Sequence, residues 1–269
     1  MSVLHVKELL IELMTASGII TAVDHVSFTL EKGETVTIIG ESGSGKSTTA
    51  MGVLGLLPKD LAVMSGTIEI EGTDVLAHPR KLAAMRGRRV ALIPQDPMTA
   101  LSPTHTIGHQ LGGAVRRGGS DRLSKREVEE KSIRLLEHVR IPSPAEQLRK
   151  FPHQLSGGML QRVLIASALA ADPVLIIADE PTSALDVTVQ AGILDLLLTL
   201  QAESELALLL ITHDLGVARV MSDRIKVMKD GRFVDRGQAD ELVDNPAVEY
   251  TRQLLDAVPR LGSWNGGDR

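Results

Sequence analysis

The segment Gly40–Ser47, which reads GESGSGKS, has the residue types and spacing of a phosphate-binding loop. It follows the apolar run TVTIIG, which is typical of a buried strand, and it opens the segment KSTTAMGVLGLL, which favours a helix. Glycines let successive backbone N–H groups converge on phosphate oxygens, and the N-terminus of a helix adds positive potential. We therefore expect a nucleoside triphosphate here, and the alternative is a glycine-serine turn on the surface.

Two side chains of this loop have distinct expected roles. Lys46 is expected to reach the β- and γ-phosphates, and the hydroxyl of Ser47 is expected to ligate Mg²⁺. The residues expected to contact the nucleotide are Gly40, Glu41, Ser42, Gly43, Ser44, Gly45, Lys46, Ser47 and Thr48.

A pair of adjacent carboxylates ends a second apolar run, VLIIADE. Ligands of open α/β sheets bind at the carboxyl ends of the strands, where Asp179 and Glu180 are expected to lie. Asp179 can hold Mg²⁺ through a coordinated water, and Glu180 can act as general base toward the attacking water. The alternative, a strand that runs into an acidic loop, is less favoured in a chain that also carries a phosphate loop.

A second cluster of small residues, Ser156-Gly157-Gly158, begins the apolar segment LSGGMLQRVLIASALA. A helix that starts here forms a second anion site, and the alternative is a plain helix cap. The cluster lies far along the chain from Lys46, beyond a helical insertion. We therefore do not expect it to contact the same phosphates.

Composition narrows the class of protein. Of 269 residues, 43% are hydrophobic but only 2% aromatic, so the core must consist of Leu, Ile, Val, Ala and Met. The net charge of −5 argues against general nucleic-acid binding, and the absence of cysteine excludes disulfides and Fe–S clusters. We find no apolar run of about 18 residues and no signal peptide, and we expect a cytoplasmic chain that docks to any membrane partner.

The elements that must position these residues alternate between strands and helices. Residues 97–154 interrupt the alternation with a helical insertion, in which Ser124 and Glu127 form a capping box. Asp230-Gly231 is expected at the turn of a hairpin, and the tail from about residue 239 is expected to be helical up to Pro259. Strands are expected over 9–13, 22–31, 35–40, 89–97, 174–178 and 206–212, and an antiparallel pair over 66–75. Helices are expected from residue 46, over 124–142, from 157, over 187–201 and from 214.

The motifs LSGGMLQR, IIADEPTSALD and ITHD, in this order, resemble those of the ATP-binding subunits of ABC transporters. The resemblance covers essentially the whole chain. It implies a P-loop NTPase (RecA-like) α/β core with an N-terminal antiparallel β subdomain and a helical insertion. The implied parts are 1–96 (β subdomain and first part of the core), 97–160 (helical subdomain with the signature), 161–238 (second part of the core) and 239–269 (C-terminal helical tail).

The resemblance also implies roles for further residues. Gln95 is the residue that touches the metal or water and reports nucleotide state to the insertion, and His213 contacts the γ-phosphate. Leu155–Met159 is the signature, which closes over ATP bound to a second, facing ATPase subunit, and Ser183–Asp186 is the D-loop. The implied catalytic set is Glu180, His213 and Gln95, with ATP as substrate and Mg²⁺ held by Ser47, Gln95 and Asp179.

The segments QDPMTALSPTHTIGHQL and NPAVEYTRQLLDAVP resemble the peptide, opine and nickel importer branch. This implies a peripheral subunit on the cytoplasmic face of the inner membrane. Its partners would be a similar ATPase subunit in a heterodimer, two permease subunits and an external binding protein. Many peptide importers carry a cysteine-containing extension for an Fe–S cluster, and this chain has no cysteine. Its short length and the segment SGGMLQR are similar to those of nickel-importer ATPase subunits. Nickel is therefore the first expectation for the cargo, with peptides or opines as the alternative.

Two other classes remain as alternatives. A non-transport ABC ATPase would act on DNA or ribosomes, but such proteins usually carry coiled-coil inserts or two ATPase units, and nucleic acid is not an expected partner here. A P-loop kinase would leave the Ser156 cluster without a role.

Three further features bear on specificity. No aromatic residue precedes Phe28, so Met14 or Ile20 is expected to pack against the base, and GTP hydrolysis would be compatible with such a site. His105 and His109 stand four apart, as helical metal ligands can, but no third ligand accompanies them. The basic segment 80–89 lacks interleaved aromatics and is expected to be a solvated face.

Lys46→Ala is expected to weaken nucleotide binding, because it removes the cation that faces the β- and γ-phosphates. Titration with a fluorescent nucleotide analogue measures this, and an unchanged affinity would contradict the assignment of the loop.

Overall fold

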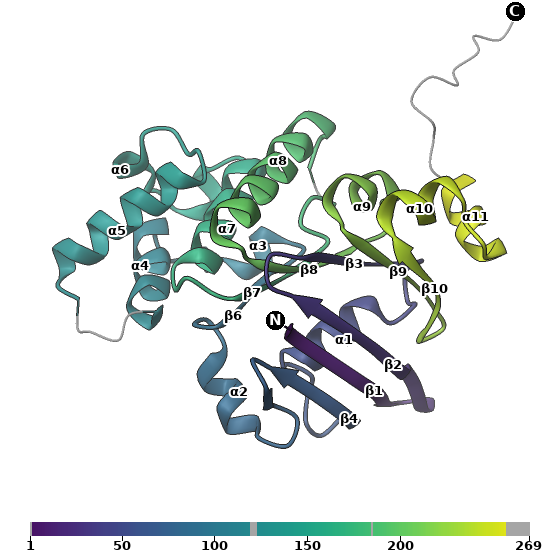
Figure 1. The fold of residues 1–269 in the computed structure, drawn as a ribbon. Coiled ribbons are helices and arrows are strands. Elements are labelled where there is room, and N and C mark those ends of the chain that lie inside the picture. The colour runs from purple at the N-terminus through teal and green to yellow at the C-terminus, as the bar shows by residue number, and fades with distance from the viewer. Residues whose placement is uncertain (1, 119–122, 184, 257–269) are drawn as a thin grey trace, which may run out of the picture.

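A computed structural model describes residues 2–118, 123–183 and 185–256 of the chain. The architecture combines two sheets with helices in the layers around them (Figure 1). The predicted α/β class, with an antiparallel N-terminal sheet and a helical insertion, is confirmed.

The larger sheet has six strands in the order β10-β9-β3-β8-β7-β6. All pairs are parallel except β9–β10. The three central strands are buried along their whole length, which explains why they read as continuous apolar runs rather than as alternating patterns. The strands are β3 (Thr35–Ile39), β6 (Val90–Ile93), β7 (Leu175–Asp179), β8 (Ala207–Thr212), β9 (Arg224–Lys229) and β10 (Arg232–Gln238).

The smaller sheet is antiparallel, with the order β2-β1-β4-β5. The alternating pattern of its strands buries one face against the larger sheet, with helix α1 (Lys46–Val53) in the same apolar cluster. Leu4 of β1 and Ile38 of β3 are both fully buried in this cluster. The strands are β1 (Ser2–Thr15), β2 (Gly18–Glu31), β4 (Ala62–Ile70) and β5 (Thr73–Asp74).

The insertion forms a helical lobe beside β6 and β7, at the left of Figure 1. Its longest helix begins at the predicted capping box, in which the Ser124 hydroxyl accepts from the Glu127 backbone and the Glu127 carboxylate accepts from the Ser124 backbone. The elements of the lobe are α3 (Pro97–Ala100), α4 (Ile107–Gly118), α5 (Lys125–His138), α6 (Pro144–Gln147), η1 (Pro152–Gln154) and α7 (Gly157–Leu169). The apolar faces of α4, α5 and α7 share one core with the adjacent face of the larger sheet.

The remaining helices are α2 (Pro79–Met85), α8 (Val187–Ser204), α9 (Leu215–Met221), α10 (Ala239–Asp244) and α11 (Glu249–Asp256). The helices α9, α10 and α11 pack with Ile39 and β9 in a third apolar cluster. The predicted hairpin joins β9 to β10, and its turn residues Asp230 and Gly231 both have positive φ, 47° and 80°. The predicted helical tail is found as two helices, α10 and α11, with a non-helical break at residues 245–248, and Pro259 lies outside the described residues.

The predicted four-part division of the chain stays a prediction. Helix α7 runs without a break through its boundary at residue 160, and residues 257–269 of the last part lie outside the described residues.

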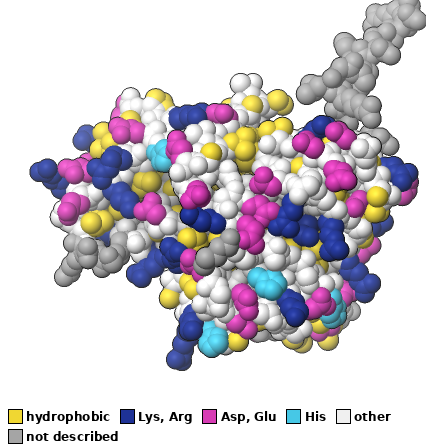
Figure 2. All heavy atoms as spheres, viewed as in Figure 1, with side chains coloured by type: hydrophobic (Ala, Val, Ile, Leu, Met, Phe, Trp, Pro, Cys, Tyr) yellow, Lys and Arg dark blue, Asp and Glu magenta, His cyan; other side chains and the backbone are white. Residues whose placement is uncertain are grey.

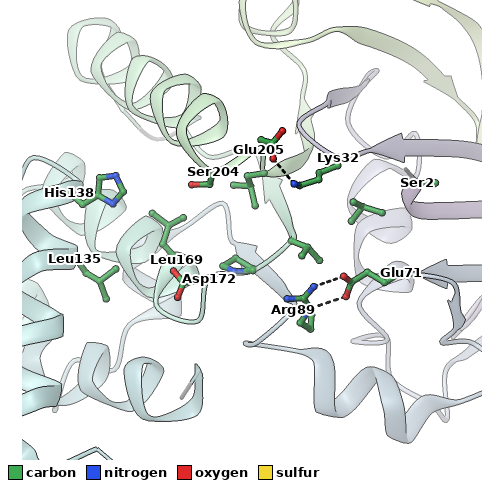
Figure 3. Close-up of a pocket in the computed structure, with 14 residues that line it drawn as sticks. Ser2, Lys32, Glu71, Arg89, Leu135, His138, Leu169, Asp172, Ser204 and Glu205 are labelled. Atoms are coloured by element: carbon green, nitrogen blue, oxygen red, sulfur yellow. Dashed lines mark hydrogen bonds and ion pairs between the residues drawn. The ribbon is translucent and has the colours of Figure 1, made fainter. Parts of the chain in front are cut away.

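A pocket of about 380 Å³ lies where the β sheet, the core and the helical lobe meet, at the amino ends of β6, β7 and β8 (Figure 3). Figure 3 shows the Arg89 guanidinium facing the Glu71 carboxylate and the Lys32 ammonium facing Glu205. Each ion pair connects the antiparallel sheet, or a turn at its edge, to a segment of the core. These charges therefore help to hold the two layers together.

Charged side chains of both signs are interspersed over the face drawn in Figure 2, in keeping with the small net charge. Within the described part of the chain, no helix combines the length and the apolar character that crossing a membrane requires.

Candidate active site

The predicted phosphate loop connects β3 to α1, and its glycines are required by close packing. Gly40 and Gly45 have φ values of 154° and 104°. A Cβ on Gly40 would lie 2.2 Å from the Met228 carbonyl oxygen, and one on Gly45 would lie 2.4 Å from that of Ala22. Only glycine fits these two positions, so the loop is held tightly against its neighbours.

The loop carries polar atoms that suit an anion. Ser44 is buried, and its Oγ has no hydrogen-bond partner among the described residues. Lys46 is also buried, and its Nζ donates to the carbonyl oxygens of Gly40 at 2.8 Å and Glu41 at 2.7 Å. Burial lowers the pKa of Lys46, while the nearby carboxylates of Glu180 and Asp179 act in the opposite direction. A partnerless hydroxyl and a lysine bonded only to carbonyl oxygens are groups that phosphate oxygens can satisfy.

Ser47 and Asp179 are brought together as predicted. The Ser47 hydroxyl donates to Asp179 Oδ1 at 2.9 Å, although 132 residues separate them in the chain. Asp179 is buried at the end of β7, and this burial raises the pKa of its carboxyl group. A hydroxyl and a carboxylate oxygen at this distance are the hard oxygen ligands that Mg²⁺ prefers, so the residues present fit this metal.

Glu180 is the meeting point of the three predicted catalytic residues. Gln95 Nε2 donates to Glu180 Oε2 at 3.0 Å, and His213 Nδ1 lies 3.1 Å from Glu180 Oε1. A small cavity of about 110 Å³, lined in part by Glu180, Thr212 and His213, adjoins them. The three side chains follow the carboxyl ends of β6, β7 and β8, which the parallel register places at one edge of the sheet.

The backbone of Glu180 is unusual. Its φ of 45° places a non-glycine residue in the left-handed region, and its N–H donates to the Ile211 carbonyl at 2.8 Å. Such backbones cost free energy and are retained mostly at functional sites. This geometry turns the chain immediately after Asp179, so that successive carboxylates face different partners.

The Ser156 cluster lies on the surface of the chain and is not bonded to the phosphate loop. Ser156 caps α7 by accepting from the Met159 N–H at 3.4 Å, and both Ser156 and Gly157 are exposed. A Cβ on Gly158 would lie 2.4 Å from Val189 Cγ1, so this glycine permits close packing of α7 on α8. Among the hydrogen bonds of residues 2–118, 123–183 and 185–256, none joins this cluster to the phosphate loop.

Two contacts at the site were missed by reasoning from residue spacing. Ser183 Oγ accepts from Gln95 Nε2 at 3.3 Å, which ties the predicted D-loop to Gln95, while Ala184 of that loop lies outside the described residues. The Glu41 N–H donates to the hydroxyl of Tyr250 at 3.3 Å. Only the status of Tyr250 as the chain's single tyrosine could have drawn attention to it.

The histidine pair and the basic segment 80–89 contact other residues of the chain. His105 and His109 stack with ring centroids 4.5 Å apart, and the described residues hold no cluster of three metal-ligating side chains. Within the basic segment, Arg86 donates to the carbonyl oxygens of Leu54 and Gly55 at the end of α1. The expectations that His105 and His109 bind no metal and that the basic segment is a solvated face stay predictions.

The predicted base contacts lie on the hairpin between β1 and β2. Met14 and Ile20 are both about half exposed, with 53% and 50% of their surface accessible. Ile20 precedes by two residues Ala22, whose carbonyl abuts Gly45 of the loop. Their role against the base stays a prediction.

Comparisons with known proteins agree with this geometry. Residues 23–183 match the family described as ABC transporter. The dipeptide transport ATP-binding protein DppD of Bacillus subtilis is 44% identical over 268 residues, which are 99% of this chain and 79% of that protein. The oligopeptide transport ATP-binding protein OppD of Salmonella typhimurium is 44% identical over 261 residues, 97% of this chain and 77% of that protein.

Solved structures with the same fold include the dimeric post-hydrolysis state of the ATP-binding cassette MJ0796 bound to ADP and Pi. It has a TM-score of 0.78 and 28% identity, covering 88% of this chain and 98% of that one. The structure of cbiO1 from Clostridium perfringens, part of the ABC transporter complex cbiONQ, has a TM-score of 0.74 and 27% identity, covering 97% of each chain.

Fold and sequence together define the class: this is a P-loop ATPase with a helical insertion. Within that class the chain belongs to the ABC transporter family, as an ATP-binding subunit whose ATP hydrolysis energises transport.

Glu180→Gln is expected to bind ATP normally but to lose turnover by at least about 100-fold, because an amide cannot accept the proton of the attacking water. Phosphate release measures turnover, and titration with a fluorescent nucleotide measures affinity. Glu129→Gln, which changes an exposed carboxylate on α5, is the matched control and should keep wild-type turnover. Wild-type turnover in the Glu180 variant would remove it as the base.

Proposed function

We propose that this chain hydrolyses ATP at a site completed by a second, facing ATPase subunit, and that the hydrolysis drives import of peptides. The observation that carries the cargo is the 44% identity to a dipeptide transport protein over 99% of this chain. The residues of the chain bind the phosphates, accept the proton of the attacking water and connect the site to the helical lobe.

Binding is assigned to the loop Gly40–Thr48. Its backbone N–H groups and the start of α1 receive the phosphate oxygens, and Lys46 exchanges its carbonyl partners for the β- and γ-phosphates. Ser47 and Asp179 are the residues that would hold Mg²⁺, which supplies positive charge against the phosphates when bound.

Proton transfer is assigned to Glu180. Its carboxylate accepts a proton from the attacking water, and the hydrogen bond from Gln95 together with the adjacent His213 ring fixes its orientation. His213 is exposed on its other side, where it can reach the γ-phosphate. Gln95 lies between β6 and the helical lobe, so its bond to Glu180 connects the chemistry to the lobe. Its amide oxygen makes no hydrogen bond among the described residues and is available to the metal.

Contact with the nucleotide of the second subunit is assigned to the exposed start of α7. Ser156 and Gly157 present a capped helix N-terminus that has no anion partner within this chain's own site. The MJ0796 cassette, which has the same fold, is dimeric in its structure with ADP and Pi. We infer that each nucleotide contacts the phosphate loop of one subunit and the Ser156 cluster of the other, in a pair of similar chains.

For the cargo, the comparisons favour the alternative that the sequence analysis kept open. The relatives reported above are named for dipeptide and oligopeptide transport, so we now place peptides before nickel. Membership of a peptide importer implies two permease subunits, an external peptide-binding protein and a position on the cytoplasmic face of the membrane.

Ser156→Arg is expected to leave ATP binding by the isolated chain unchanged and to reduce hydrolysis by at least about 100-fold, because a bulky cation at this helix start obstructs the facing nucleotide. Nucleotide titration and phosphate release measure the two properties. Ser204→Arg, which places the same side chain at the exposed end of α8, is the control and should hydrolyse normally. Normal hydrolysis in the Ser156 variant would contradict the shared site.

Cargo is tested by uptake in cells that lack this chain and receive either the wild type or Glu180→Gln. Labelled dipeptide uptake should return with the wild type alone, at least about tenfold above the variant, because the variant lacks the base. Labelled nickel is measured in parallel in the same cells. Restoration of nickel uptake without peptide uptake would overturn the peptide assignment and reinstate the first expectation.

A further inference from the structure

The outer side of the phosphate loop is backed by the hairpin of β9 and β10. The Gly231 N–H at the hairpin turn donates to the Ser44 carbonyl at 3.0 Å. The Met228 carbonyl packs against Gly40 so closely that a Cβ there would lie 2.2 Å away. The loop is therefore held from outside by a segment about 190 residues further along the chain.

Glu41, in the first half of the loop, is bonded on both sides. Its carbonyl oxygen accepts from Lys46 Nζ at 2.7 Å, on the side where phosphate is expected. Its N–H donates to the hydroxyl of Tyr250 at 3.3 Å, on the side of helix α11. One residue of the loop thus links the phosphate-facing lysine to the C-terminal helix.

Tyr250 is itself fixed in place. It is 8% exposed and belongs to the apolar cluster of Ile39, the residue that immediately precedes the loop. Lys229 Nζ lies 4.5 Å from the centroid of its ring. The adjacent Thr251 is fully buried, and its hydroxyl donates to Asp235 Oδ2 of β10 at 2.7 Å. Helix α11 therefore presents the hydroxyl of Tyr250 at a defined position rather than on a free end.

The hydroxyl is suited to accept this bond. Burial raises the pKa of Tyr250, so the phenol stays neutral at physiological pH and its oxygen accepts without placing a negative charge beside the triphosphate.

We infer that Tyr250 is a positioning residue for the ATPase reaction, whose hydroxyl fixes the Glu41 backbone and so aligns Lys46 and the loop for the triphosphate. The inference rests on the assignment of Gly40–Thr48 to phosphate binding. It extends the ATP site to α11, which lies beyond the residues 23–183 that match the family.

Tyr250→Phe is the test, because it keeps the ring beneath Lys229 and removes only the oxygen. The KM for ATP and the dissociation constant of a fluorescent analogue should each rise about two- to tenfold, which is the loss expected for one backbone hydrogen bond. The kcat should stay within about twofold of wild type, because no group at the reacting atoms changes. Steady-state kinetics and titration of the full chain measure these values.

Two further variants separate the possible results. Tyr250→Leu removes both ring and oxygen, and it should raise KM at least as much while also lowering the unfolding midpoint. Lys46→Ala should weaken nucleotide binding whether or not Tyr250 positions the loop. If Tyr250→Phe leaves KM unchanged while Lys46→Ala weakens binding, the inference is overturned and the phosphate loop stands.

A fall in kcat and in the unfolding midpoint of Tyr250→Phe, with KM unchanged, would equally overturn the inference, because it would indicate packing alone. If Lys46→Ala also leaves binding unchanged, the assignment of the loop itself has failed.

Discussion

The site depends on the parallel register of β3, β8, β7 and β6. Asp179 pairs with Ile211, and Ile39 with Thr212, so the strands end together at one edge of the sheet. Everything polar that the chemistry uses follows directly from these ends: the phosphate loop after β3, Glu180 after β7 and His213 after β8. A slip of one residue in any of these strands would move each of its side chains to the opposite face of the sheet and shift the polar residues at its end away from the loop.

The sequence predicted correctly those elements whose structure is determined by interactions between residues close together in the chain. The apolar runs before Gly40 and Asp179 predicted strands buried on both faces, and the pair Asp230-Gly231 predicted a hairpin that needs two positive φ values. The same holds for the capping box at Ser124, since its two hydrogen bonds join residues three apart. In each case the determining contacts lie within a few residues or within one strand.

Contacts between distant segments could not be predicted in this way. The bond between Gln95 and Glu180 spans 85 residues and was not predicted, since the resemblance implied only a contact of Gln95 with the metal or water. The bond between Glu41 and Tyr250 spans 209 residues and left no pattern in the spacing of either segment. The left-handed backbone of Glu180 also gave no sign, because no residue type in ADEP marks the position. The positive φ is shared elsewhere in the described chain by Glu8, Glu71 and Glu205.

The unbroken course of α7 has a mechanical consequence. Thirteen residues at 1.5 Å each make a rod about 20 Å long, with the exposed Ser156 at one end and apolar side chains from Leu160 onward buried in the core. A helix of this kind resists bending, so a force applied at its tip is delivered to the far end as tilt rather than absorbed on the way. Gly158 lets Val189 of α8 pack directly against this rod, so a displacement of α7 would displace α8 through that contact. A partner that pressed on Ser156 would in this way displace α7 and α8 together.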